Sequence, residues 1–218
     1  MPLSDQTREK LRTVSTATIS TALFKRGLRN QMMQGVRPLD PDKPTMVGEA
    51  FTLRYIPARE DLNPITVFQD RSHPQRKAVE ECPPGAVFVI DSRKDPRAAS
   101  AGSILVTRLM KRGVAGIVTD GGFRDAGEIA RLDIPAFHNR PSAPTNLTCH
   151  QALDINVPIG CGDAPVFPDD VIVGPSGFSC NHFAGDCTVV EFPGMGHELL
   201  TATNRATTIS AIREFFGY

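Results

Sequence analysis

An arginine and an aspartate stand side by side at the end of the segment RGVAGIVTDGGFRD, residues 112–125. Residues 114–119 are apolar and rich in β-branched side chains, which predicts a buried strand that ends at a turn of Asp120 and two glycines. Arg124 and Asp125 follow this turn, and α/β folds tend to bind ligands at strand ends. Arginine can clamp a carboxylate, and aspartate can hold Mg²⁺. The pair indicates a substrate and metal site; a surface ion pair after a loop is the alternative.

A second candidate is the start of the next helix upstream, at Gly102 and Ser103. Glycine allows close approach of the backbone, and Ser103 is a plausible N-cap. The first-turn N–H groups of Ser103, Ile104 and Leu105 have no acceptor within the helix, so they can bind a carboxylate or phosphate. The polar loop 92–101 could carry this helix start to Arg124. An ordinary capped helix is the alternative.

The composition is that of an ordinary globular protein: 40% of the 218 residues are hydrophobic and 22% are charged. Lys+Arg and Asp+Glu balance at 24 each, so net charge gives no electrostatic case for direct nucleic-acid or membrane binding. No run of about 18 apolar residues predicts a membrane span. The N-terminal residues lack the apolar core of a secretory signal, and we expect a cytoplasmic protein.

The five cysteines are scattered and odd in number, which argues against a disulfide framework. Cys180, His182 and Cys187 lie close together in the sequence, but their spacing fits no common zinc site.

Hydrophobic periodicity predicts an α/β fold with mixed sheets in a single domain over residues 1–218. The first half reads as helix, strand, helix end, strand, helix, strand, short helix and strand, with a βαβ unit around the Arg-Asp pair. The second half reads as short strands in a more antiparallel layer. The expected helical ranges are 4–27, 76–82, 103–113 and 127–132; the expected strands are 48–56, 86–91, 114–119, 134–137, 157–159, 171–173 and 188–192.

The segments 48–52, 84–91, Gly102 and 112–125 resemble the RraA-like family, named for the regulator of ribonuclease activity A. That family includes divalent-metal 4-hydroxy-4-methyl-2-oxoglutarate aldolases, and the resemblance covers about residues 14–173. It implies a β/β/α swivelling-type layered domain that assembles as a homotrimer or hexamer, with sites between subunits.

The resemblance also implies roles for individual residues. Arg124 matches the arginine that grips the carboxylate of the substrate, and Asp125 matches the ligand of Mg²⁺ or Mn²⁺. Ile104 and Leu105 match backbone donors to the substrate, in a binding segment that begins at Gly102 and Ser103. The implied activity is an aldolase or decarboxylase type lyase that forms a metal-stabilised pyruvate enolate from a small 2-oxo acid.

One departure from the family bears on the chemistry. The aldolases have an acidic residue 21 positions before the arginine, and here that position is Ser103. Serine is a poor general base at neutral pH, so we expect weak or altered lyase activity, with oxaloacetate decarboxylation less affected than retro-aldol cleavage. The alternatives are a non-catalytic regulator of ribonuclease activity and another metal-enolate enzyme, a hydratase or isomerase. The retained Arg124 and Asp125 favour chemistry.

Two further regions are left open by the sequence. After Gly174 the family pattern stops abruptly, so segment 175–218 is either divergent or frameshifted, and the intersubunit acidic ligand expected there is unassigned; Glu191 and Glu198 are candidates. The polar cluster of Asp70, Arg71 and His73 either lines the pocket or forms a solvated loop.

Overall fold

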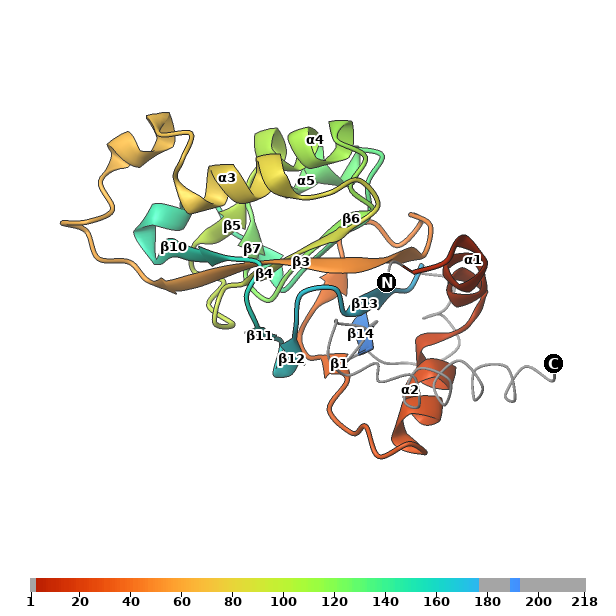
Figure 1. The fold of residues 1–218 in the computed structure, drawn as a ribbon. Helices are drawn as coiled ribbons and strands as arrows, with labels where there is room; N and C mark the ends of the chain where they lie inside the picture. Colours follow the sequence, from red (N-terminus) through yellow and green to blue (C-terminus); the bar gives the residue numbers. More distant parts are fainter. Residues whose placement is uncertain (1–2, 177–188, 193–218) are drawn as a thin grey trace.

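A nine-stranded mixed sheet forms the centre of the computed structural model, which describes residues 3–176 and 189–192 (Figure 1). The strand order is β1-β14-β13-β3-β4-β6-β8-β2, with β10 also paired to β3. These strands are β1 (Met32–Met33), β2 (Arg37–Pro38), β3 (Met46–Pro57), β4 (Val87–Asp91), β6 (Gly116–Thr119), β8 (Ala136–His138), β10 (His150–Ile155), β13 (Val171–Gly174) and β14 (Val189–Phe192).

The long strand β3 joins the two halves of this sheet. Its first residues, 46–49, pair antiparallel with β13, and residues 53–57 pair antiparallel with β10. Residues 50–54 pair on the opposite edge with β4, in parallel. β4, β6 and β8 continue in parallel. The expected parallel βαβ unit and the more antiparallel second half are therefore confirmed.

Three helices, α3 (Pro74–Glu81), α4 (Ser103–Lys111) and α5 (Ala126–Ala130), lie on one face of the sheet (Figure 1). Because side chains alternate along a strand, Phe88 and Ile90 of β4 pack towards these helices, while Val87 and Val89 pack in a second cluster on the other face. Burial of both faces explains why the first four residues of β4, 87–90, are all apolar.

The N-terminal helices α1 (Asp5–Thr13) and α2 (Thr16–Phe24) pack near β3 and β13 in a third apolar cluster. The single helix expected over residues 4–27 is wrong. Val14 is extended, and Ser15 begins the second helix by accepting a hydrogen bond from the N–H of Thr18. A side-chain cap in the middle of the apolar pattern therefore splits the helix.

Smaller elements complete the fold: the parallel sheet of β5 (Ala99–Ala101), β7 (Gly122–Phe123) and β9 (Arg140–Pro141), the hairpin of β11 (Ile159–Cys161) and β12 (Ala164–Val166), and the 3₁₀ turns η1 (Ile65–Gln69) and η2 (Asn146–Thr148). β5 lies within the segment expected to be a polar loop. The strand expected over residues 157–159 is displaced to β11.

The described residues bear on the expectation about membrane spans and on only a small part of segment 175–218. No helix in the described residues is long and apolar enough to cross a membrane. The cluster of Cys180, His182 and Cys187, and most of segment 175–218 with Glu198, lie outside the described residues. The backbone of Glu191 lies in β14, opposite Ile172.

Candidate functional site

Parallel pairing of β5 with β7 brings the two candidate segments together. Ala101 is opposite Phe123, and the N–H of Arg124 donates to the carbonyl of Ala101 over 3.0 Å. The chain therefore leaves both strands at the same end, which places Gly102 and Ser103 beside Arg124 and Asp125. The predicted approach of the helix start to the Arg-Asp pair is confirmed.

Asp125 contacts the first residue of α4 directly. Its Oδ2 accepts hydrogen bonds from the backbone N–H and from the Oγ of Ser103, both at 3.2 Å. A carboxylate at a helix start is favoured by the unpaired N–H groups and the helix dipole. Gly102 leaves room for this contact, because a Cβ there would lie 3.1 Å from Asp125 Oδ2.

The expectation that Ser103 is the N-cap of this helix is wrong. Gly102 is the N-cap, and no side chain of the helix makes a capping hydrogen bond. The hydroxyl of Ser103 is directed to Asp125 instead. Asp125, 22 positions further along the chain, thus accepts the hydrogen bond that a capping side chain of the helix itself could have accepted.

The backbone of Asp125 is held in an unusual conformation, with φ 55° and ψ 34°, in the left-handed region. Its carbonyl accepts from Glu128 and Ile129 and so begins α5, but its side chain does not cap that helix. Strained backbone of this kind persists where the surroundings impose it, often at ligand sites. Here it turns the carboxylate away from its own helix and towards α4.

Several polar groups at this site are available to a ligand. Arg124 and Asp125 are exposed, and Arg124 has no carboxylate partner among the described residues. The N–H groups of Ile104 and Leu105 bond no acceptor in the described part of the chain. The site combines one guanidinium, one carboxylate and two amides at the start of a helix, which can bind a small carboxylic acid together with a cation.

Asp120, which follows β6, has a structural role. It is 2% exposed, and its carboxylate accepts from the N–H groups of Ser92 (2.7 Å), Lys94 (3.1 Å) and Gly162 (3.3 Å). Burial raises the pKa of Asp120 to about 6, against the lowering effect of these amides. Asp120 therefore joins three loops rather than facing the ligand.

The donor set fits a hydrated magnesium ion rather than a closed metal centre. Within the described residues, no group of three or more His, Cys, Asp or Glu side chains could hold a metal. Asp125 Oδ1 accepts no hydrogen bond from those residues, so one carboxylate oxygen remains for a cation. Mg²⁺ commonly binds one or two carboxylates and completes its octahedron with water and substrate oxygens.

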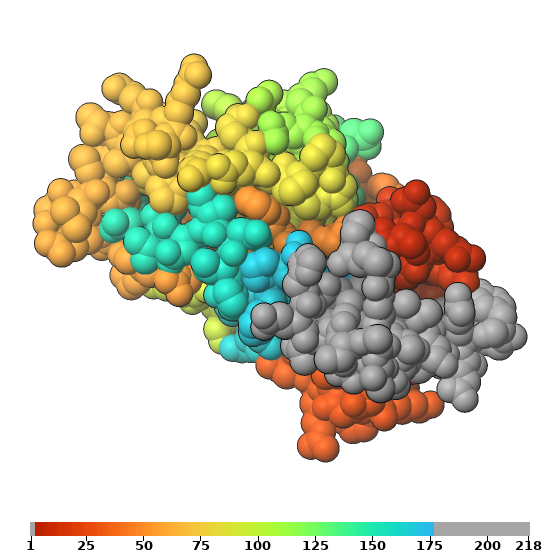
Figure 2. Space-filling model, in the orientation of Figure 1, coloured from red at the N-terminus to blue at the C-terminus, as the bar shows by residue number. Residues whose placement is uncertain are grey.

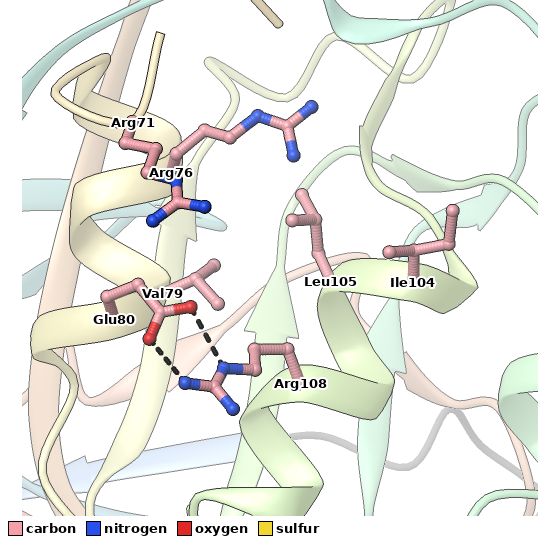
Figure 3. A pocket seen from close by; sticks show the side chains of 7 residues that line it. All are labelled: Arg71, Arg76, Val79, Glu80, Ile104, Leu105 and Arg108. Carbon is pink, nitrogen blue, oxygen red and sulfur yellow. Dashed lines mark hydrogen bonds and ion pairs between the residues drawn. The ribbon is translucent and has the colours of Figure 1, made fainter. Parts of the chain in front are cut away.

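A pocket of about 540 Å³ opens beside the start of α4 (Figure 3). Figure 2 shows the surfaces of α3 and α4 adjacent on this side of the molecule. Ile104, Leu105 and Arg108 of α4 line one side, and the facing side carries Arg71, which precedes α3, with Arg76 and Glu80 of α3.

Of the cluster of Asp70, Arg71 and His73, expected either to line the pocket or to form a solvated loop, Arg71 lines this pocket, whereas Asp70 and His73 are not among its lining residues. Arg76, Glu80 and Arg108 were not predicted from the sequence. The four-residue spacing of Arg76 and Glu80 on one helix was the available signal.

Comparisons with known proteins show the family to which this chain is similar. The family model RraA-like, described as Aldolase/RraA, matches residues 16–176. A protein of Halalkalibacterium halodurans, provisionally named 4-hydroxy-4-methyl-2-oxoglutarate aldolase, is 33% identical over 165 residues, covering 76% of this chain and 70% of its own length.

Solved structures are similar in fold. Streptomyces coelicolor RraAS2, described as an unusual member of the RNase ES inhibitor RraA protein family, superposes with a TM-score of 0.73 at 24% identity, over 98% of each chain. An uncharacterized protein from Pseudomonas syringae pv. tomato gives 0.72 at 20% identity, over 99% of this chain and 84% of that one. At these identities the likeness shows the fold alone.

Proposed function

Because the chain belongs to the RraA-like family, we propose that it is a divalent-metal-dependent carbon–carbon lyase acting on a small 2-oxo acid. The candidates are oxaloacetate and acids such as 4-hydroxy-4-methyl-2-oxoglutarate. The observation that carries the proposal is the contact of Asp125 with the start of α4, which joins a cation ligand to free backbone donors. The related protein provisionally named as an aldolase supports the same reaction class.

In this proposal each residue has a separate task. Arg124 binds the carboxylate beside the 2-oxo group and offsets its charge, while the amides of Ile104 and Leu105 orient the acid. Asp125 would hold Mg²⁺ or Mn²⁺. When bound, the cation would draw electron density from the 2-oxo group and so favour cleavage of the C3–C4 bond, whose electron pair would pass into the C2–C3 enolate.

Ser103 decides which cleavage is easier. Its hydroxyl already donates to Asp125, and it carries no charge with which to take a proton. A retro-aldol step requires removal of a proton from the 4-hydroxyl group, which becomes the carbonyl of the second product, whereas decarboxylation releases CO₂ without that removal. We therefore place oxaloacetate decarboxylation ahead of aldol cleavage for this chain.

Pyruvate release from oxaloacetate and from 4-carboxy-4-hydroxy-2-oxoadipate, with Mg²⁺, with Mn²⁺ and with EDTA, tests the function. We expect metal-dependent release that Asp125→Ala abolishes. Asp133→Ala, which removes an exposed carboxylate eight residues away, is the matched control and should leave release unchanged. Absence of release from both acids with either metal would overturn the lyase and favour a ribonuclease regulator or another metal-enolate enzyme.

The remaining parts of the proposal concern assembly and location. We propose a cytoplasmic homotrimer or hexamer of a single-domain chain, with the site near a subunit boundary. Sedimentation analysis of the full chain measures the assembly, and a monomer would contradict it.

A further inference from the structure

The pocket between α3 and α4 carries positive charge that the described residues do not neutralise. Glu80 binds Arg108 through two hydrogen bonds, of 2.9 and 2.7 Å, and also lies 3.5 Å from Arg112. Its carboxylate is therefore already shared between two guanidinium groups. Arg71 and Arg76 line the same pocket and form no ion pair with the described residues.

The side chain of Arg76 packs on an aromatic ring, but one of its N–H groups has no hydrogen-bond partner in the described part of the chain. Its guanidinium lies 5.4 Å from the centre of the Phe68 ring, and its Nε is buried without a hydrogen-bond partner in the described part of the chain. A buried donor without a partner costs free energy, and a ligand carboxylate could provide the missing charge. Figure 3 shows both arginines across the pocket from Ile104 and Leu105.

The pocket and the candidate lyase site share one helix start. Ser103 touches Asp125, and the next two residues, Ile104 and Leu105, line the pocket. The two sites therefore adjoin along the first turn of α4. A ligand whose reactive end lies at Arg124 and Asp125 would extend its other end towards Arg71 and Arg76.

We propose that Arg71 and Arg76 form a subsite for a second carboxylate, at the end of the substrate remote from the 2-oxo group. This inference rests on the proposed function. The two arginines then select dicarboxylic over monocarboxylic 2-oxo acids, because only a second carboxylate can form charge-assisted hydrogen bonds with them. They are specificity residues and take no part in bond cleavage.

Calorimetric titration of the Mg²⁺-loaded protein with 2-oxoglutarate and 2-oxobutanoate tests the subsite. The two acids share the 2-oxo carboxylate end, and only the first has a distal carboxylate. We expect 2-oxoglutarate to bind at least tenfold more tightly, and the preference to disappear in Arg71→Gln/Arg76→Gln while the affinity for 2-oxobutanoate is unchanged. Lys77→Gln, which removes an exposed charge of α3 outside the pocket, should keep the preference.

Equal binding of the two acids by the wild type, or a preference that survives the double substitution, would overturn the subsite. The single variant Arg71→Gln, at an exposed residue before α3, keeps the test valid if the double variant fails to fold. Failure of the proposed function gives a different result: binding of both acids would be indifferent to EDTA and to Asp125→Ala, while the dependence on the two arginines remained.

Discussion

Replacing Ser103 by aspartate should restore the charge that this site lacks. Ser103 Oγ lies 3.2 Å from Asp125 Oδ2, so the new carboxylate would be close to that of Asp125. Two like charges about 4 Å apart repel by about 1 kcal/mol in water, the appropriate medium because Asp125 is exposed. A divalent cation between them reverses the sign, so Ser103→Asp should bind Mn²⁺ more tightly than the wild type.

The larger effect is expected on the rate. A positioned general base contributes about 10²–10⁴-fold, so Ser103→Asp should raise retro-aldol cleavage of 4-carboxy-4-hydroxy-2-oxoadipate by that order. Oxaloacetate decarboxylation should change much less. The assay is pyruvate release under saturating Mg²⁺, with Ser103→Asn as a control of equal size without charge. Equal rates for the aspartate and asparagine variants would show that position 103 does not control proton transfer.

Three further predictions concern the support of the site. Gly102→Ala places a Cβ 3.1 Å from Asp125 Oδ2, so the carboxylate must shift and Mn²⁺ should bind several-fold more weakly in a spin-resonance titration; unchanged affinity would contradict the close fit. Phe123→Ala empties a site that is 0% exposed and should lower the free energy of unfolding in urea by about 3–5 kcal/mol; a loss below about 1 kcal/mol would show that the core collapses around it. Burial raises the pKa of Asp120 from 3.8 to about 6, so the folded state binds the proton more tightly than the unfolded state. The contribution of Asp120 to the free energy of unfolding should therefore fall by up to about 3 kcal/mol as pH rises from about 4 to above 6. Thermal unfolding of the wild type and Asp120→Asn across this range measures it, and a difference independent of pH would be the contrary result.

The central elements were predictable because their patterns are local. β4 and β6 are short apolar runs ended by polar turns, and α4 has an amphipathic period that ends at Gly113. Such signals depend on residues a few positions apart. The order of these elements was enough to predict a parallel unit and an Arg-Asp pair at the end of one of its strands.

The geometry of the site was less predictable because it depends on distant pairing. β5 and β7 have three and two residues, too few to show a period. Their pairing nevertheless brings Ser103 to Asp125, and it explains why Ser103 caps nothing on its own helix. The pocket likewise depends on two helices packed side by side, so Arg76 and Arg108 had no joint signal in the sequence.

Binding of Mn²⁺, followed by electron spin resonance in the presence and absence of pyruvate, is the first measurement to make on this site. We expect that the wild type binds the ion, that pyruvate tightens this binding, and that Arg124→Gln removes the effect of pyruvate while Asp125→Ala removes the binding itself. Mn²⁺ binding of equal strength in the wild type and Asp125→Ala would contradict the claim that Asp125 and Arg124 form one site for a metal and a 2-oxo acid.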